Sequence, residues 1–372
     1  MGKEKINIPA GKMRILVAPL DWGLGHATRC IPIIHELLAN GCEVLVAAEN
    51  GTKSLLQKEF PQLVFLPLAG YGVKYSNRKS WMPVKILLQS PKLFYSIYKE
   101  HQWLQKAVKI YTIDAVISDN RFGLFHRSIL SVYITHQLAI KTGNRFSENI
   151  AQKIHSWFIK KYNVCWVPDF EGDKNIAGDL SHPKKKLLNV TYLGCLSRFE
   201  KKPAVNKKYK LIIIISGPEP QRAIFENIVL KQLQFYKDAV LFVRGLPNII
   251  STKESENKNI LIVNHLLSEE LNIAIQQSDY VISRSGYTTV MDLIKLKQKA
   301  IFVPTPGQTE QEYLAEHLAK QKLFFYATQE NFSLEKSLQE ANSFPFIIPE
   351  FNMEKYKIVI ADFVQALKKR NL

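Results

Sequence analysis

The sequence is poor in cysteine, and the few it has are not spaced for cross-linking or metal binding. Its four cysteines lie far apart and form no Cys-x-x-Cys pair: Cys30, Cys42, Cys165 and Cys195. This spacing favours neither a disulfide framework nor a zinc site. Residues 1–12 are polar, and the apolar run that begins at Ile15 is interrupted by Asp21, so we expect no signal peptide. A reducing, cytoplasmic location fits these absences best.

Long apolar runs and metal-binding motifs are also missing. No segment approaches the roughly 20 consecutive apolar residues that a membrane-spanning helix needs, so we expect any contact with a membrane to be made from one side. No Asp-x-Asp pair is present to hold a divalent ion, and the nine histidines include no two at the close spacing of metal ligands. We therefore expect neither a metal nor a cofactor, and helix ends and arginines would stabilise a charged ligand instead.

Acidic residues are outnumbered by basic ones. The chain has 50 Lys and Arg against 33 Asp and Glu, for a formal net charge of +17. This balance predicts a negatively charged partner, which can be nucleic acid, an anionic membrane surface or a phosphorylated substrate, and charge alone does not choose among them. With 372 residues, 46% of them hydrophobic, the chain is long enough for two domains with a core in each.

The first half of the sequence has the pattern of a parallel α/β domain. An apolar strand at residues 13–20 runs into a turn that contains Gly23 and Gly25, and an amphipathic helix and a strand at 43–48 follow. This is a βαβ unit with a glycine turn at its first corner, the beginning of a doubly wound sheet. Further apolar runs predict strands at 64–68, 115–118, 132–135 and 164–167. We assign residues 1–200 to this domain.

A basic, polar segment separates the two halves. We place the hinge near residues 197–208, which are rich in lysine. The apolar run 211–215 then begins a second domain, at 208–350, that repeats the pattern of the first, with more strands expected at 239–244 and 260–263. Residues 353–367 predict an amphipathic helix with five side chains available for burial: Ile358, Ile360, Phe363, Val364 and Leu367.

The most informative stretch contains two strand-to-helix turns close together. The run 279–283 predicts a buried strand, Ser285 and Gly286 break it, and a helix is expected over 288–296. Free backbone N–H groups at the start of that helix would attract an anion such as a phosphate. Asp292 lies about one turn further along, where its carboxylate suits hydrogen bonding to sugar hydroxyls.

A second strand, at 300–303, ends at the stiff turn 304–307. This turn delivers three polar side chains toward the same edge of the sheet: Gln308, Gln311 and Glu312. Ligands of open α/β sheets bind at that carboxyl edge, so the two turns are predicted to form one ligand-holding unit.

This unit resembles the carboxyl-terminal, donor-binding half of the MurG-like glycosyltransferases, of the glycosyltransferase family 28 type. The family carries an Arg-Ser-Gly turn, an acidic residue on the next helix, and a Pro-rich turn followed by a Gln pair. The matching features here are Arg284 to Gly286, Asp292, and Gln311 with Glu312, the last standing where the family has its second Gln. The resemblance implies that Asp292 binds the ribose of a UDP-sugar and that the residue pair contacts the donor sugar.

The same resemblance extends the donor site to neighbouring loops. It places a glycine-rich turn and an arginine near the donor phosphates, and the backbone near Leu267 against the uracil edge. The residues expected to bind the donor are Gly25, Ser216, Gly217, Arg222, Leu267, Arg284, Ser285, Gly286, Tyr287, Thr288, Asp292, Gln308, Gln311 and Glu312. Arg222 would offset the charge of the leaving diphosphate. For Arg222 a surface position on a rigid turn is the alternative, and for Arg284 a buried structural ion pair.

The turn Gly23-Leu24-Gly25-His26 resembles the glycine-rich loop that ends in His at the amino terminus of the same family. A histidine there can take the hydroxyl proton of the acceptor, and the alternative is a histidine that only orders the turn. Asp119 and His136 each follow a predicted strand and so are alternative bases.

The stretch from Lys74 to Lys109 interleaves basic and aromatic side chains, and it contains no acidic residue between Lys74 and Lys99. This mixture suits an anionic membrane surface, where rings lie at headgroup level and cations meet phosphates. It also suits single-stranded nucleic acid. An ordinary solvated face over core aromatics is the remaining interpretation.

These features predict an α/β protein of GT-B architecture, with two Rossmann-like domains and an interdomain cleft. The resemblance implies that the C-terminal helix, at 353–372, crosses back to the first domain. The resemblance implies inverting, metal-independent transfer of a hexose or N-acetylhexosamine from a UDP-sugar to a hydroxyl of a lipid-linked or glycan acceptor, as in cell-envelope glycan biosynthesis. We expect a peripheral enzyme at the inner face of the cytoplasmic membrane. A UDP-sugar hydrolase on the same scaffold and a basic nucleic-acid-binding protein are the alternatives.

Overall fold

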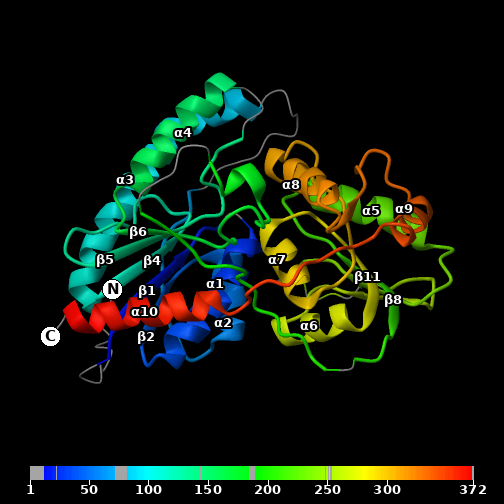
Figure 1. Ribbon diagram of the computed structural model, residues 1–372, viewed down its shortest axis with the longest axis horizontal. Helices are drawn as coiled ribbons and strands as arrows, with labels where there is room; N and C mark the ends of the chain where they lie inside the picture. Colours follow the sequence, from blue (N-terminus) through cyan, green and yellow to red (C-terminus); the bar gives the residue numbers. More distant parts are fainter. Residues whose placement is uncertain are drawn as a thin grey trace.

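The computed structural model describes residues 12–21, 23–71, 82–141, 145–183, 189–203, 205–247, 249, 251 and 254–370. In the helices that begin at residues 82 and 145, side chains are described from residues 91 and 147 onward. The chain forms two lobes, each built around one sheet with helices against it (Figure 1).

The first lobe is a seven-stranded sheet with the order β3-β2-β1-β4-β5-β6-β7, in which every neighbouring pair is parallel. Its strands are β1 (Arg14–Pro19), β2 (Glu43–Ala47), β3 (Val64–Leu66), β4 (Ala115–Asp119), β5 (Leu130–Ile134), β6 (Val164–Val167) and β7 (Val190–Tyr192). Its helices are α1 (Leu24–Ala39), α2 (Asn50–Glu59), α3 (Met82–Tyr111) and α4 (Arg145–Ile159), and a short 3-10 helix, η2 (Gly178–Leu180), precedes β7.

The second lobe repeats this arrangement. Its six parallel strands have the order β10-β9-β8-β11-β12-β13. They are β8 (Tyr209–Ile214), β9 (Val240–Val243), β10 (Ile260–Val263), β11 (Ser278–Ser283), β12 (Ala300–Phe302) and β13 (Phe325–Tyr326). The helices are α5 (Gln221–Leu233), α6 (Ser268–Gln276), α7 (Tyr287–Leu296), α8 (Thr309–Lys320) and α9 (Leu334–Asn342). Counted along each lobe, the first six strands have the order 3-2-1-4-5-6, which is that of a Rossmann sheet.

The sequence patterns located all the strands except the short edge strand at the end of each sheet that comes last in the chain. Each strand predicted from an apolar run is present, with ends within about two residues, as expected for boundary assignment. The short strands β7 and β13 were not predicted. Both are only two or three residues long and half-buried, and the apolar run 323–327, which contains β13, was not assigned to a strand.

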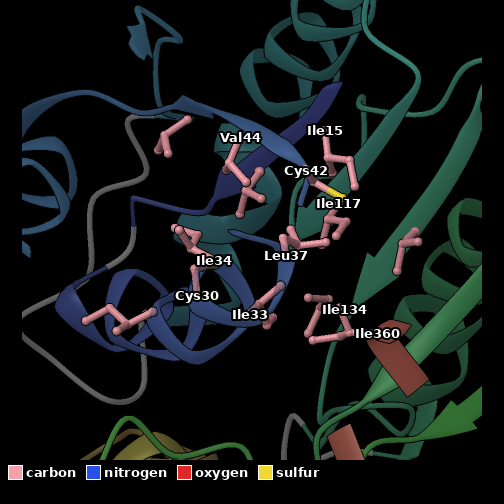
Figure 2. Close-up of a cluster of buried hydrophobic side chains, with 14 of the residues drawn as sticks. Ile15, Cys30, Ile33, Ile34, Leu37, Cys42, Val44, Ile117, Ile134 and Ile360 are labelled. Carbon is pink, nitrogen blue, oxygen red and sulfur yellow. The ribbon is translucent and has the colours of Figure 1, made fainter. Parts of the chain in front are cut away.

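Alternation along the strands supplies a core on each face of the first sheet. Ile15 and Val17 of β1 pack in the cluster with α1, whereas Leu16 and Ala18 pack on the other face in the cluster that includes Leu104 of α3. Successive side chains of a strand point to opposite faces, so a fully buried strand needs apolar residues at every position. Figure 2 shows the first of these clusters.

The last helix, α10 (Lys355–Arg370), packs on the first lobe although it follows the second in sequence. Five of its side chains are buried: Tyr356, Ile360, Phe363, Val364 and Leu367. All but Tyr356 were predicted. The prediction for Ile358 was wrong, since 60% of this side chain is exposed. Ile358 lies two residues from Ile360, which on a helix is about 200° around the axis and therefore on the opposite face.

In each sheet the direction in which successive strands are added reverses at the centre, between β1 and β4 in the first sheet and between β8 and β11 in the second. Ligands of such sheets bind beside the carboxyl ends of these strands. Helix α7, which follows β11, contacts α1, which follows β1 (Figure 1). The helix starts that follow the two central strands therefore belong to one region between the lobes.

Candidate active site

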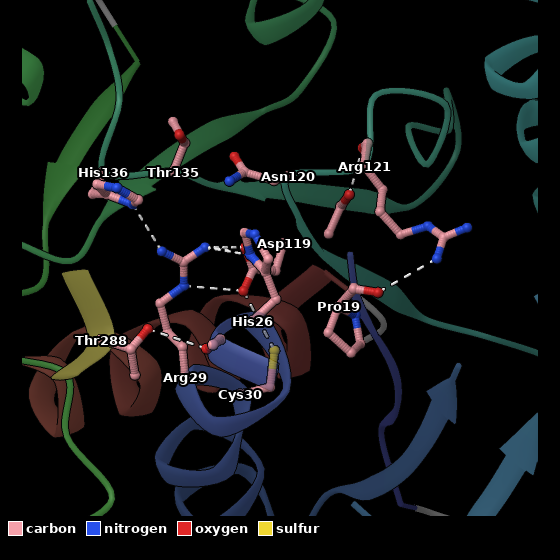
Figure 3. A network of polar contacts seen from close by, with 12 residues as sticks. Pro19, His26, Arg29, Cys30, Asp119, Asn120, Arg121, Thr135, His136 and Thr288 are labelled. Atoms are coloured by element: carbon pink, nitrogen blue, oxygen red, sulfur yellow. Dashed lines mark hydrogen bonds and ion pairs between the residues drawn. The ribbon is translucent and has the colours of Figure 1, made fainter. Parts of the chain in front are cut away.

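The region between the lobes is organised around a buried carboxylate. Asp119, the last residue of β4, is fully buried. Arg29 of α1 donates from Nε to Asp119 Oδ2 over 3.0 Å, and its Nη2 donates to Oδ1. Burial by itself would raise the pKa of the Asp119 carboxyl, but Arg29 and then His26 more than offset this and hold the pKa well below its usual range. Asp119 is therefore an ionised carboxylate whose two oxygens both accept hydrogen bonds from Arg29 (Figure 3).

His26 lies in the first turn of α1, and 17% of its side chain is exposed. Its Nδ1 lies 3.0 Å from Asp119 Oδ1 and 2.9 Å from Arg29 Nη2. An ionised carboxylate can only accept a hydrogen bond and a guanidinium can only donate one. Nδ1 therefore bonds Asp119 when it carries a proton and Arg29 when it does not. When Nδ1 carries the proton and donates to Asp119, Nε2 has a free lone pair. Nε2 has no hydrogen-bond partner among the described residues, and it is the ring atom open to a substrate.

His136 follows β5 and uses both of its ring nitrogens. Nδ1 lies 2.9 Å from Arg29 Nη1, and Nε2 lies 2.6 Å from Oε1 of Glu310, the second residue of α8. The ring also stacks on that of Tyr287, with centroids 4.1 Å apart and planes 3° from parallel. Of the three predicted alternative bases, His26 alone combines partial exposure with an unbound ring nitrogen, so the geometry favours His26 and makes Asp119 the group that orients it.

The start of α7 meets the first glycine turn. Thr288 Oγ1 donates to the backbone oxygen of Gly25 over 3.1 Å, and a Cβ on Gly25 would lie 3.5 Å from Thr288 Oγ1. Gly286 caps the helix, whose first i to i−4 bond runs from the Val290 nitrogen. The N–H groups before Val290 have no partner inside the helix, and they form the positive end of the helix dipole. An anion bound there would lie beside the loop that carries His26.

Asp292 is buried against the segment that joins the lobes. Ser197 Oγ donates to Asp292 Oδ1 over 2.6 Å, and Arg198 Nε lies 3.8 Å from Oδ2. Burial raises the pKa of Asp292 to about 6, against the opposing effects of Arg198 and Ser197. Arg198 was not among the predicted site residues, because a single arginine in a hinge gives no sequence signal. Its Nε is buried without a hydrogen-bond partner in the described chain.

Arg198 also connects Asp292 to the start of α6. Its Nη1 donates to Ser268 Oγ over 3.2 Å, and Ser268 in turn donates from its backbone nitrogen to Glu59 of α2 over 3.0 Å. The N–H of Leu267, at the predicted uracil position, donates to Glu270 Oε2 over 3.0 Å. The predicted ribose and base positions are therefore linked through the interdomain segment.

Two arginines of the predicted donor site, Arg222 near the donor phosphates and Arg284 after β11, have other partners. Arg222 donates from Nε to Glu219 Oε1 over 2.5 Å and from Nη1 to Glu226, a carboxylate that it shares with Arg244. Both glutamates lie on the same turn and helix as Arg222. The turn before them, Ser216 and Gly217, is exposed. Arg222 is therefore neither an unpaired cation facing the donor phosphates nor an unpaired arginine on the surface, which were the two predictions for it.

Arg284 is buried and supports the Pro-rich turn. It donates to the backbone oxygens of Val303 over 3.0 Å and Pro304 over 3.3 Å, and its Nη2 bonds Gln329 Oε1 over 2.6 Å. No carboxylate pairs with it among the described residues, and burial lowers its pKa to about 10. The alternative of a buried ion pair is therefore not what the contacts show, because Arg284 bonds backbone carbonyls and the Gln329 side chain instead.

The polar residues after the Pro-rich turn do lie together. Gln311 Nε2 donates to Gln308 Oε1 over 2.5 Å, and Gln311 Oε1 accepts from the Thr305 nitrogen over 2.9 Å. Glu312 Oε1 accepts from the Gly307 nitrogen over 3.0 Å. Ser285 Oγ donates to the backbone oxygen of Gln311 over 2.7 Å, which joins the two predicted turns into one unit.

A second feature of the first lobe is an exposed apolar surface on α3 and α4, here called the α3/α4 patch. Its members each expose between 41% and 61% of their surface: Phe94, Tyr95, Tyr98, Ile150, Ile154 and Trp157. Phe94 and Trp157 both contact the ring of Phe158, so the two helices share one surface. Lys161 Nζ lies 3.6 Å from the Trp157 ring centroid. Residues 74–81 of the basic-aromatic stretch lie outside the described residues.

Three absences hold for the part of the chain that the structure describes. The four cysteines are free, buried thiols. No group of three His, Cys, Asp or Glu side chains there is placed to hold a metal ion. None of the described helices combines the length and the apolar composition needed to cross a bilayer.

Comparisons by sequence identify the family of the chain. Residues 204–363 match the model of the glycosyltransferase family 28 C-terminal domain. Over 331 residues the chain is 30% identical to the UDP-N-acetylglucosamine--N-acetylmuramyl-(pentapeptide) pyrophosphoryl-undecaprenol N-acetylglucosamine transferase of Buchnera aphidicola subsp. Schizaphis graminum. The match covers 86% of each chain.

Solved structures show the same fold at low identity. The spinosyn rhamnosyltransferase SpnG, complexed with thymidine diphosphate, superposes with a TM-score of 0.60 at 14% identity, over 95% of this chain and 96% of that one. The MurG of Acinetobacter baumannii superposes with a TM-score of 0.50 at 14% identity, over 96% of this chain and all of that one. The predicted GT-B architecture is confirmed.

The raised pKa of Asp292 predicts a pH-dependent effect on stability. The Asp292 carboxyl keeps its proton up to about pH 6 in the folded protein but releases it near pH 3.8 in the unfolded chain. The contribution of Asp292 to the free energy of unfolding therefore falls as pH rises between these values. Relative to Asp292→Asn, the wild type should lose on the order of 3 kcal/mol of unfolding free energy between pH 4 and pH 7. Urea denaturation of both proteins at several pH values measures the difference in unfolding free energy. If that free energy depends on pH equally in the two proteins, the raised pKa of Asp292 is wrong.

Proposed function

The chain belongs to the MurG-like glycosyltransferases of family 28, and on that premise we propose that it moves a hexose or N-acetylhexosamine from a UDP-sugar to a hydroxyl of a lipid-linked acceptor. The observation that carries this proposal is the contact between the start of α7 and the Gly25 turn. It brings a helix start suited to a diphosphate next to the His26 and Asp119 pair, which is suited to deprotonating a hydroxyl.

The donor would bind along the second lobe. The free N–H groups at the start of α7 would hold the diphosphate, and Asp292 would accept hydrogen bonds from the ribose hydroxyls. Asp292 has lone pairs left beyond the one that Ser197 uses, and Arg198 keeps a positive charge beside it. The Gln311 and Glu312 side chains, held in the first turn of α8 by bonds to the backbone of the Pro-rich turn, would contact the donor sugar in this proposal.

Transfer would proceed by a single displacement with inversion and without a metal ion. His26 Nε2 would take the acceptor's hydroxyl proton while the acceptor oxygen forms a bond to the anomeric carbon. The bond from that carbon to the diphosphate oxygen breaks, and its electron pair leaves with UDP. Asp119 accepts from Nδ1 and so stabilises the imidazolium that forms. The α7 N–H groups stabilise the negative charge that develops on UDP.

The α3/α4 patch would bring the enzyme to its acceptor. Exposed aromatic side chains beside lysines suit the headgroup level of an anionic bilayer. The patch belongs to the lobe that carries His26, so a lipid-linked acceptor held at the membrane would approach the proposed base. The relative from Buchnera aphidicola is named for an undecaprenol-linked acceptor, which supports this class of acceptor. We propose the inner face of the cytoplasmic membrane as the working location.

Calorimetric titration tests the donor class. UDP should bind saturably and more tightly than GDP, dTDP or UMP, and Asp292→Ala should weaken binding by about 10- to 100-fold, because it removes charge-assisted hydrogen bonds. Asp279→Ala is the matched control, since Asp279 lies at the opposite end of β11 in a surface ion pair. Preference for dTDP, or equal affinity without Asp292, would overturn the ribose assignment.

A transfer assay tests the base. With a panel of UDP-hexoses and UDP-N-acetylhexosamines and a polyprenyl-diphosphate-linked sugar as acceptor, His26→Ala should lower kcat by about 10²- to 10⁴-fold. Its UDP affinity should be unchanged, because the groups that hold UDP in this proposal, the α7 N–H groups and Asp292, lie on the other lobe. His35→Ala, an exposed histidine of the same helix, should match the wild type. Equal kcat values for the two variants would exclude His26, and free sugar as the sole product would indicate the hydrolase.

Vesicle co-sedimentation tests the α3/α4 patch. The protein should bind vesicles that contain phosphatidylglycerol, and binding should weaken in high salt. Tyr98→Asp and Trp157→Asp should each weaken binding by about tenfold or more, because burial of an aromatic side chain stabilises by roughly 1.5–3 kcal/mol. Phe235→Asp is the control, since Phe235 is 88% exposed on the second lobe. Tight binding to oligonucleotides without vesicle binding would favour the nucleic-acid alternative.

A further inference from the structure

Glu310 makes a contact that the proposed catalytic steps do not use. It is the second residue of α8, in the same turn as Gln308 and Gln311 of the proposed donor site. Its side chain crosses to the first lobe, where Oε1 lies 2.6 Å from His136 Nε2 and Oε2 accepts from Gln137 Nε2. A third of the Glu310 side chain is exposed. The contact therefore joins the donor lobe to the loop that follows β5.

The contacts of His136 determine which nitrogen carries its proton. Arg29 Nη1, at 2.9 Å from Nδ1, has only hydrogens to offer, so Nδ1 must accept. The proton of the neutral ring is then on Nε2, which donates to Glu310 Oε1. An ionised carboxylate is the strongest acceptor for that N–H, and the pair is a charge-assisted hydrogen bond. Stacking on Tyr287 of α7 fixes the plane of the ring.

This orientation reaches the proposed base through one side chain. The Arg29 guanidinium donates to His136 from Nη1 and to Asp119 from Nε and Nη2, and Figure 3 shows it lying between the two residues. Asp119 then holds His26 Nδ1. Because the guanidinium is planar and rigid, the position of His136 helps to set the angle at which Arg29 meets Asp119.

We propose that Glu310 is a positioning residue that makes the geometry of the His26 base depend on contact between the two lobes. Glu310 acts from the donor lobe by holding His136 with its proton on Nε2, which leaves Nδ1 to bind Arg29. The catalytic pair on the first lobe is then fully oriented only when α8 is in place beside it. This inference rests on the proposed role of His26.

A carboxylate suits this position better than an amide or an alanine. Both of its oxygens accept, so it can serve His136 and Gln137 together, whereas an amide has one accepting oxygen and one donating nitrogen. Glu310→Gln should therefore keep the bond to His136, since Gln137 can rotate its own amide to accept from the new one. Glu310→Ala removes both bonds and leaves the His136 N–H without its partner.

Histidine nitrogen NMR on protein labelled with ¹⁵N-histidine tests the proton position without any substrate. The His136 signals, identified by their loss in His136→Gln, should show a neutral ring protonated on Nε2. In Glu310→Ala the proton should stay on Nε2, because Arg29 still donates to Nδ1, but the Nε2 signal should shift with the loss of its carboxylate acceptor, and the His26 signals should shift as well. Glu316→Ala, an exposed glutamate of the same helix, should leave both sets unchanged. A His136 ring protonated on Nδ1 in the wild type would overturn the inference.

Steady-state kinetics provide the second test, with the same donor and acceptor panel. Glu310→Ala should lower kcat roughly 10- to 100-fold with little change in the donor KM, because the base is misplaced while the donor contacts remain. Glu310→Gln should recover most of the loss, and it also serves if Glu310→Ala does not fold. A kcat for Glu310→Ala equal to that of Glu316→Ala would refute the positioning role. Absence of transfer by the wild type would refute the proposed function, while the NMR result would still decide the proton position.

Discussion

A carboxylate buried at the end of a central strand needs cationic partners, and this need organises the region between the lobes. Asp119 has no exposed surface, and an unpaired charge in such a place would be strongly unfavourable. Arg29 meets the need with two hydrogen bonds and in doing so fixes the first turns of α1. His26 and His136 then take their positions from these two residues. The electrostatic requirement of the fold and the geometry of the proposed base are one arrangement.

The second constraint is the close approach of two loops from different lobes. Gly25 and Thr288 are in contact through a hydrogen bond to the Gly25 backbone. Since a glycine has no Cβ, the backbone there is open to a neighbour. This contact brings a helix start with free N–H groups next to the loop of the proposed base, which is the juxtaposition that a transfer between two substrates requires. Neither lobe provides that arrangement alone.

The parts of the site that could be predicted follow from strand ends. Asp119 was predicted because a polar residue at the end of a buried strand must lie at the carboxyl edge of the sheet. His26 and Asp292 were predicted from their places in helices that follow such strands, together with the family resemblance. Their roles could not be ranked, because ranking depends on which nitrogen or oxygen is already bonded. Arg222 and Arg284 show the same limit, since their partners are carboxylates and carbonyls that no sequence pattern identifies.

By itself the sequence determined the two parallel sheets, the position of their central strands and the amphipathic last helix, because apolar periodicity is a local property of the chain. The return of that helix to the first lobe was implied only by the family resemblance. Only the tertiary structure decided which side chains meet across the lobes. Glu310 and His136 are 174 residues apart, and the link between Asp292 and Arg198 spans the hinge. Such pairs depend on how two folded units dock, and docking is governed by shape and charge over whole surfaces, which no local pattern records.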